Sequence, residues 1–304
     1  MLVLRFAVSA TALGLVLARF EIGSAARALP DVGPRPVVAA FAAYLASQWL
    51  SAMRWNRVLR SVGLNLDGGL AAKYYFIGMF FNLFAPSTFG GDVARVFYVR
   101  RRALDTTTAT LSVVLDRGIG FAWLAVIAGI ALTTFERVEL PVELERATYV
   151  IAAVALTISA AAVVLARRRP RAKEGFGKIV FGLRTLLYDR AMLLGTSALS
   201  LLVHGAQIAA AVALVVAIVP EVHWSYCFVF HPLVAMLAAL PISLAGLGVR
   251  EAGYVYFLAT LGGASIEHAT TFALVWLAIV LAASALGAVV FFAGGEARPQ
   301  RASD

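Results

Sequence analysis

Charged side chains stand inside the apolar runs of this 304-residue chain, close to prolines and glycines. They form three neighbouring pairs of opposite charge: Asp92 with Arg95, Asp116 with Arg117, and Arg250 with Glu251. A guanidinium group presents several N–H donors in one plane, and this geometry suits the oxygen atoms of a phosphodiester. The residue types therefore indicate a site for an anionic group, with phosphate as the first candidate.

Two of the pairs follow a break in an apolar segment. Residues 86–95 read PSTFGGDVAR, and residues 241–250 read PISLAGLGVR. Proline lacks an N–H donor and glycine permits positive φ or close backbone approach, so we expect a helix to stop at each break. Helices that restart near Val93 and Val249 would point free N–H groups and positive dipole ends at the break, which favours anions.

The same charges could instead serve only the fold. Asp92 could cap the restarted helix and pair with Arg95, while Arg250 could pair with Glu251 or extend toward the membrane surface. Ionisable groups inside a membrane are costly and usually functional, so we favour the binding role at the two breaks.

Asp116 and Arg117 are adjacent on a predicted helix, where neighbouring side chains point about 100° apart and cannot simply neutralise each other. Each therefore needs another partner, and Arg95 and Glu251 are the candidates. A structural ion pair and a substrate site stay equally open for these two residues.

Uncharged polar residues also lie in the apolar segments. We expect neighbouring helices to satisfy the hydrogen bonds of His204, Gln207 and His231. Asn82 comes one turn before Pro86, so we expect its side chain to satisfy backbone carbonyls that the break leaves free.

The composition places these charges in an all-α, polytopic membrane protein. Hydrophobic residues make up 61% of the chain and charged residues 14%, against about a quarter charged in soluble domains. Several apolar segments reach the roughly 20 residues needed to cross a hydrocarbon core. The segments fall at about 2–18, 37–53, 74–91, 106–133, 147–166, 191–219, 226–247, 252–264 and 269–292.

Lysine and arginine mark the connections that we expect in the cytoplasm. They include Arg54, Arg57, Arg60, Lys73, Arg100, Arg101, Arg102 and the run 166–178. The acidic connection 134–146 and the connection 220–225, which contains no Lys or Arg, are expected outside. The sequence thus predicts a protein of a bacterial or archaeal-type cytoplasmic (inner) membrane with both termini inside. Its formal charge of +9 indicates contact with anionic lipid and not with nucleic acid.

This topology makes 74–102 and 226–264 two re-entrant elements that enter from opposite sides. Proline, a hydroxyl residue, glycine and arginine recur in the two breaks at a shift of 155 residues, from Pro86 to Pro241. Paired broken helices of this kind are typical of transporters with inverted repeats. The sequence therefore predicts about six spanning helices, two re-entrant elements and an inverted pseudo-repeat.

We expect one membrane domain over 1–304, with halves at about 1–135 and 147–292 and a flexible tail at 293–304. The first segment, 2–18, could be a signal peptide, but we favour a retained span because the repeat needs it. Cys227 is the one cysteine, so no internal disulfide can form, and four scattered histidines offer no metal cluster. We expect no metal and no cofactor, and the sequence contains no P-loop for ATP.

Three motifs, FFNLFAPSTFGGDVARVFYVRRR, SVVLDRGIGF and LPISLAGLGVREAGYVYFLATLG, resemble the lysylphosphatidylglycerol synthase transmembrane (flippase-like) family. The resemblance covers nearly the whole chain and implies a membrane domain that moves a lipid between leaflets. The chain ends twelve residues after Phe292, so we expect no soluble synthase domain and no aminoacyl transfer. The family pattern implies these binding residues: Asn82, Pro86, Gly90, Gly91, Asp92, Arg95, Asp116, Arg117, Gly246, Gly248, Arg250 and Glu251.

We therefore expect a lipid flippase or transporter for an anionic or phosphate-bearing lipid, working passively or on a gradient. The alternative is a membrane enzyme or accessory subunit that modifies a lipid-linked glycan, isoprenoid or phospholipid. A small-ion or solute carrier would fit the repeat but not the resemblance. We favour a non-enzyme without catalytic residues, because only isolated acid–base candidates occur. The expected partner is a membrane lipid, and a homo-oligomer is possible.

Overall fold

The computed structural model of the chain describes residues 32–84, 90–103, 105–135, 140–168, 189–240, 243 and 246–293. Helices and short turns make up these ranges and no β-strand occurs in them, which confirms the predicted all-α class. Some predicted features lie outside the described residues: the apolar segment 2–18, Pro86, Pro241, most of the basic connection after Arg168, and the tail from residue 294.

The described helices follow the predicted apolar segments closely. In chain order they are α3 (Pro34–Ser61), α4 (Gly68–Phe84), α5 (Gly90–Ala103), α6 (Thr106–Thr134), α7 (Val142–Arg168), α9 (Arg190–Ile218), the short 3-10 helix η1 (Trp224–Tyr226), α10 (Cys227–Ala239), α11 (Val249–Val255), the π-helix η2 (Tyr256–Leu261) and α12 (Ile266–Ala293). Four of them, α3, α6, α9 and α12, are long and apolar enough to cross a membrane.

Local signals set the starts of the long helices. Pro34 occupies the first turn of α3, where a missing N–H costs nothing. Asp105 caps α6, because its carboxylate accepts hydrogen bonds from the backbone N–H groups of Thr107 and Thr108 at 3.0 and 3.3 Å. Asp189 caps α9 in the same way. Each cap satisfies N–H groups that have no partner within the helix.

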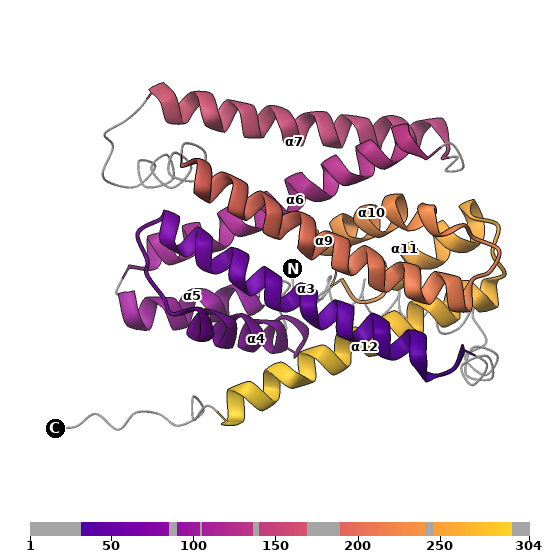
Figure 1. Cartoon of the computed structure of the whole chain (residues 1–304), viewed down its shortest axis with the longest axis horizontal. Coiled ribbons are helices and arrows are strands. Elements are labelled where there is room, and N and C mark those ends of the chain that lie inside the picture. The colour runs from indigo at the N-terminus through magenta and orange to yellow at the C-terminus, as the bar shows by residue number, and fades with distance from the viewer. Residues whose placement is uncertain are drawn as a thin grey trace.

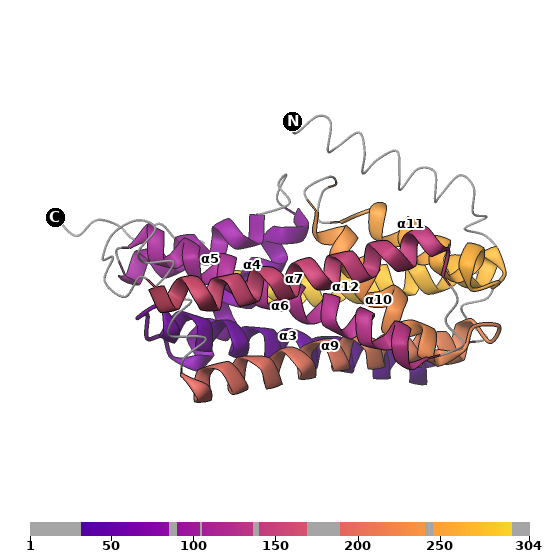
Figure 2. The ribbon, with the colours of Figure 1, turned by 90° about the horizontal axis from the view of Figure 1, so that it is seen from above.

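The long helices run along the longest axis of the molecule, and α3 packs against α9 (Figure 1) along one side of the bundle (Figure 2). Helix α7 packs against α6 at the edge of the bundle (Figure 1). Two pairs of shorter helices complete the arrangement. The pair α4 and α5 lies toward one end of the long axis, and the pair α10 and α11 lies toward the other (Figure 2).

Glycines permit the close turns of these two pairs, as predicted. In the first pair, a Cβ atom on Gly91 would lie 2.1 Å from the carbonyl oxygen of Gly78, so the α4 and α5 backbones touch. Before α11, Gly246 and Gly248 have φ angles of 75° and 78°, a region that favours glycine. Helix α11 begins at Val249 as predicted, whereas α5 begins at Gly90, three residues before the predicted Val93.

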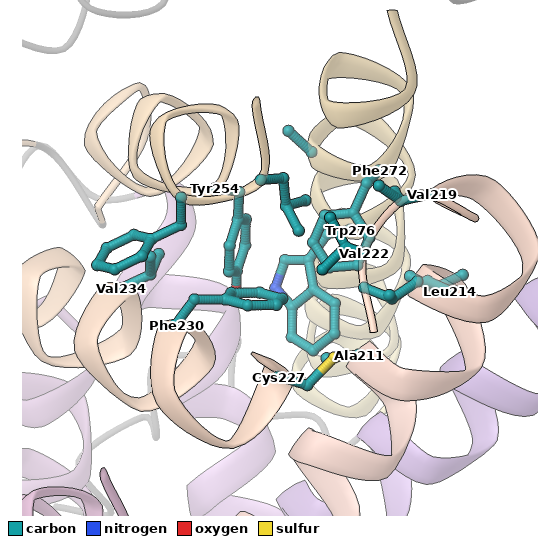
Figure 3. Close-up of a cluster of buried hydrophobic side chains, with 14 of the residues drawn as sticks. Ala211, Leu214, Val219, Val222, Cys227, Phe230, Val234, Tyr254, Phe272 and Trp276 are labelled. Atoms are coloured by element: carbon teal, nitrogen blue, oxygen red, sulfur yellow. The ribbon is translucent and has the colours of Figure 1, made fainter. Parts of the chain in front are cut away.

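An aromatic cluster holds α11 in place (Figure 3). Tyr254 on α11 is 1% exposed, and its ring meets Phe230 of α10 edge to face at a centroid distance of 5.8 Å. The same ring meets Phe272 and Trp276 of α12 at 5.2 and 5.7 Å. Edge-to-face aromatic pairs stabilise beyond their buried area. The cluster therefore fixes the position of Arg250, one helical turn before Tyr254.

One end of the bundle carries a polar contact between the turn after α9 and the start of α12. The Nδ1 atom of His268 lies 2.7 Å from Glu221 Oε1, which also accepts from the backbone N–H of Ser265 at 3.4 Å. Burial of Glu221 is slight and opposes ionisation, but its hydrogen bonds outweigh this effect and lower the pKa of the carboxyl group. This pair lies apart from the site described below.

Candidate functional site

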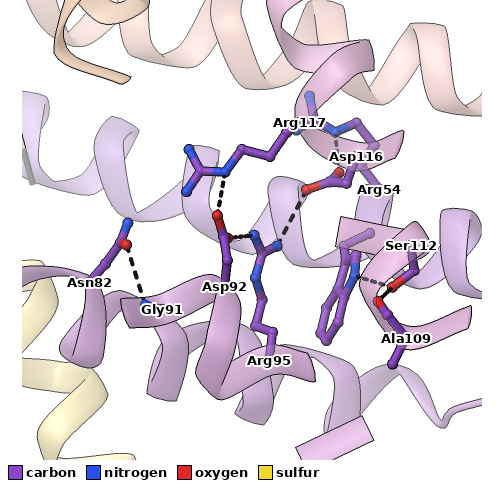
Figure 4. Close-up of polar contacts among 10 residues, drawn as sticks. Arg54, Asn82, Gly91, Asp92, Arg95, Ala109, Ser112, Asp116 and Arg117 are labelled. Carbon is purple, nitrogen blue, oxygen red and sulfur yellow. Dashed lines mark hydrogen bonds and ion pairs between the residues drawn. The ribbon is translucent and has the colours of Figure 1, made fainter. Parts of the chain in front are cut away.

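Five charged side chains from three helices form one network, of which four are buried and Arg117 is partly exposed (Figure 4). They are Arg54 on α3, Asp92 and Arg95 on α5, and Asp116 and Arg117 on α6. Three guanidinium groups stand against two carboxylates, so the network carries one uncompensated positive charge. A net charge buried among apolar helices attracts a counter-ion, because little water is present to screen it.

Arg95 lies at the centre of the network and is 6% exposed. Its Nη2 atom donates to Asp92 Oδ1, and its Nη1 atom donates to Asp116 Oδ2 at 3.4 Å. The guanidinium carbon also lies 5.2 Å from the ring centroid of Trp55 and 5.1 Å from that of Tyr75. Both carboxylates and both rings hold the side chain in one orientation.

Asp116 joins two arginines from different helices. Its Oδ1 atom accepts from Arg54 Nε at 2.9 Å, and Arg54 Nη1 donates in turn to Ser200 Oγ on α9 at 3.3 Å. The predicted contact of Asp116 with Arg95 is therefore confirmed, and Arg54 is a second partner that the sequence analysis missed.

Arg117 is the most accessible member of the network. Its Nε atom donates to Asp92 Oδ2 at 2.9 Å, so its partner is Asp92 and not the candidate Glu251. The side chain is 33% exposed, against 7% for Arg95. Figure 4 shows its two terminal nitrogen atoms pointing away from Asp92. These donors are available to a ligand without breaking the ion pair.

Our interpretation of Arg54 as a charge in a cytoplasmic connection was wrong. Helix α3 continues to Ser61, and Arg54 is 6% exposed inside it. Its burial depends on Asp116, which lies 62 positions later in the chain and could not be paired with it from the sequence. A signal was nevertheless present, since Gln48, Ser51 and Arg54 recur every three residues along one face of α3.

Asn82 meets the start of α5 from the end of α4. Its Oδ1 atom accepts from the backbone N–H of Gly91 at 3.3 Å. We expected this side chain to satisfy free carbonyl groups before the break, and that expectation was wrong for this contact. The amide oxygen instead satisfies an N–H group of the restarted helix, which has no partner within its first turn.

Arg250 is paired with Glu251 in the second break, as the structural alternative predicted. Its Nε and Nη2 atoms donate to Glu251 Oε1 at 3.0 and 2.9 Å. The other carboxylate oxygen accepts from the backbone N–H of Gly248 at 2.6 Å, and Glu251 is fully buried. Glu251 therefore fixes both the arginine and the first turn of α11.

A cavity of about 290 Å³ is lined by residues from the starts of both α5 and α11. Arg95 of α5 and Arg250 of α11 both line it, although they lie in different halves of the chain. The predicted residues that line it are Asn82, Gly91, Asp92, Arg95, Asp116, Arg117 and Arg250. Four other predicted binding residues that the structure describes lie outside the cavity lining and instead form the starts of α5 and α11: Gly90, Gly246, Gly248 and Glu251.

The wall formed by α3, α9 and α12 is polar but carries little charge. It includes Tyr44, Gln48, Ser51, His204, Gln207 and Ser284. Neither ring nitrogen of His204 makes a hydrogen bond of normal geometry among the described residues. The expectation for this residue is met only by weaker interactions with the Gly120 backbone on α6 and with the Gln207 side chain. His231 meets the expectation at one nitrogen, because its Nδ1 atom lies 3.0 Å from the Tyr254 hydroxyl. In the described ranges, no group of three or more His, Cys, Asp or Glu side chains could hold a metal ion.

The helices and the cavity define a multi-pass α-helical membrane protein with a positively charged polar site among its helices. The family model described as the lysylphosphatidylglycerol synthase TM region matches residues 2–287, so the chain belongs to that family. This membership confirms the resemblance of the three motifs and agrees with a lipid-related function in the membrane. No curated protein matches the chain.

Proposed function

We propose that this protein moves an anionic, phosphate-bearing lipid between the two leaflets of a cytoplasmic membrane. The observation that carries the proposal is the cavity between the two breaks, where a buried network with one excess positive charge meets the start of α5. A phosphodiester carries one negative charge and accepts several hydrogen bonds, so it matches this site in charge and in donor geometry.

The headgroup, but not the tails, would enter the cavity. A volume of about 290 Å³ lies at the small end of ligand pockets, so two acyl chains would stay in the bilayer. The terminal nitrogens of Arg117 would bind the phosphate first, since Arg95 is held by two carboxylates. We propose that the other predicted binding residues also hold or position the lipid headgroup.

The contacts between helices support the inverted repeat. Helix α4 packs against α12 while α10 packs against α6, and α5 packs against α6 while α11 packs against α12. These contacts correspond when α3, α4, α5 and α6 are matched with α9, α10, α11 and α12. The pairs α4–α5 and α10–α11 would then be the two re-entrant elements, each exposing the cavity to one side. Six spans with both termini in the cytoplasm complete this arrangement.

We propose a transporter in preference to the alternative of a lipid-modifying enzyme. Asp92, Asp116 and Glu251 are each held by one or two arginines. Oxygen atoms that already accept hydrogen bonds from guanidinium groups are occupied, whereas a general base needs an accessible oxygen within reach of the substrate. A site that binds a headgroup without reacting with it suits translocation.

Reconstitution into phosphatidylcholine liposomes tests the proposal. Tail-labelled phosphatidylmethanol, whose headgroup is a bare phosphodiester, should cross faster than tail-labelled phosphatidylcholine, as measured by loss of protection from dithionite. Arg117→Gln removes the accessible donors and the excess charge. Loss of one charge-assisted hydrogen bond, about 1.5–3 kcal/mol, should slow the anionic lipid roughly ten- to a hundredfold.

Arg101→Gln is the matched control, because Arg101 is exposed on α5 and lies outside the cavity lining. It should leave the rate unchanged. Equal rates for the two lipids, or equal rates for the Arg117 variant and wild type, would contradict the proposed role of the cavity.

A further inference from the structure

His204 is a buried imidazole in the wall of the cavity. It lies on α9 and is 4% exposed, and neither of its ring nitrogens makes a hydrogen bond of normal geometry among the described residues, although the Gly120 backbone and the Gln207 side chain lie close enough to interact with the ring. Buried polar groups in native proteins nearly always have partners. An unpartnered imidazole that faces a binding cavity therefore points to a species that the ring binds during function.

The charged and titratable groups around His204 come from several helices. Burial and then Arg54 of α3 oppose a proton on the ring, whereas the backbone of Gly120, the side chain of Gln207 and the carboxylate of Asp116 favour one. His231 of α10 is also close enough to interact. Arg95 and Arg250 line the same cavity. Because Asp116 is shared by two arginines, positive charge dominates around the imidazole while the cavity holds no anion.

An anion in the cavity reverses this balance. The negative charge of a phosphodiester would offset the excess charge of the network and stabilise a protonated imidazole nearby. A neutral imidazole offers one N–H donor and one acceptor, whereas the protonated ring offers two donors. The second donor suits phosphate oxygens, which only accept hydrogen bonds.

We propose that His204 takes up one proton when an anionic headgroup enters the cavity, so that the protein carries lipid and proton together. The proton comes from water and binds the free ring nitrogen, and it returns to water when the headgroup leaves. No bond of the lipid is formed or broken. A monoanionic lipid and a proton are together neutral, so a pH difference would drive the movement and a membrane voltage would not.

The inference rests on the proposed anion site and adds a driving force to it. Linkage makes the coupling reciprocal: if the bound anion favours the proton, then a lower pH must favour the anion. Uptake of one proton per lipid makes the affinity rise by up to about tenfold for each unit fall in pH. The affinity stops rising with falling pH once His204 is protonated in the lipid-free protein as well as in the lipid-bound protein.

Calorimetric titration of the detergent-solubilised protein with short-chain phosphatidylmethanol tests the coupling directly. Titrations between about pH 5 and 8, in two buffers of different ionisation enthalpy, give the number of protons taken up with each lipid. Wild type should take up one proton over part of this range. This measurement needs no variant, so it stands even if a substitution at His204 disturbs folding.

Two variants test whether His204 is the residue that takes up the proton. His204→Gln replaces the imidazole with a side chain that cannot take up a proton in this pH range, so its affinity for phosphatidylmethanol should show no pH slope and its proton uptake should fall to zero. His268→Gln removes a histidine that lies outside the cavity lining, and it should keep the full slope.

The outcomes separate the two proposals. Binding without proton uptake in wild type, or an unchanged pH slope in His204→Gln, overturns the coupling and leaves the anion site intact. Absence of phosphatidylmethanol binding by wild type at every pH overturns the anion site and the coupling with it.

Discussion

At the scale of single residues, the buried ion pairs of the network depend on each other. Asp116 is 3% exposed and accepts hydrogen bonds from Arg54 and Arg95 at once. A buried ion pair adds little net stability, because both charges lose their water, but removal of one partner leaves a buried charge without compensation. The network is therefore sensitive to changes at its carboxylates, and its excess charge makes it receptive to an anion.

We expect Asp116→Asn to lower the free energy of unfolding by about 3–5 kcal/mol, because two buried guanidinium groups would then face a neutral amide. Thermal unfolding in detergent measures the effect. Asp189→Asn is the matched control, since Asp189 caps α9 and Asn caps helices equally well. Similar melting temperatures for the two variants would contradict the described pairing of Asp116.

The sequence identified both carboxylates of the network and two of its three arginines. Proline and glycine at the breaks, and charges inside apolar runs, are local signals that need no knowledge of the fold. Arg54 was misassigned because it follows an apolar segment and precedes other basic residues. Only the packing of α3 against α6 and α9 makes it a buried residue of the site.

At the scale of elements, the contact between α4 and α5 sets the position of the network. Gly78 and Gly91 let the two backbones touch, and Asp92 and Arg95 follow within one turn. The sequence predicted the start of α11 correctly but predicted the start of α5 three residues too late. The reason is that Asn82, on the preceding helix, satisfies the N–H of Gly91 and so helps an earlier start.

Gly91→Ala should destabilise the protein and impair anion binding. The added methyl group would meet the Gly78 carbonyl oxygen at 2.1 Å, and backbone atoms cannot move aside cheaply. Overpacking of this kind costs about 1–3 kcal/mol and would shift the start of α5.

Gly118→Ala on α6 is the matched control, because no atom lies within 4 Å of the added methyl group. It should be neutral or stabilising by up to about 1 kcal/mol, since alanine favours helix more than glycine. Thermal unfolding and phosphatidylmethanol titration of both variants measure the difference. Equal stability of the two variants would show that the α4–α5 contact has room to adjust.

At the scale of the whole molecule, the composition and the apolar segments predicted an all-α membrane protein, and the family match agrees with it. The cavity itself could not be predicted, because its walls come from helices far apart in the chain. His204 illustrates the difference: the sequence treats it as one polar residue in a span, whereas the packing places it unpartnered in a wall of the site. The proposed function requires that a lipid phosphate occupies that cavity.

The most direct test is a cryo-electron microscopy structure of the protein in nanodiscs that contain phosphatidylmethanol. We expect phosphate density inside the cavity, within about 3 Å of the terminal nitrogens of Arg117, with the acyl chains extending toward the bilayer. Arg117→Gln in the same nanodiscs should lack this density. A wild-type structure with lipid phosphates only at the membrane surface, and a cavity that holds water or acyl chains, would contradict the claim.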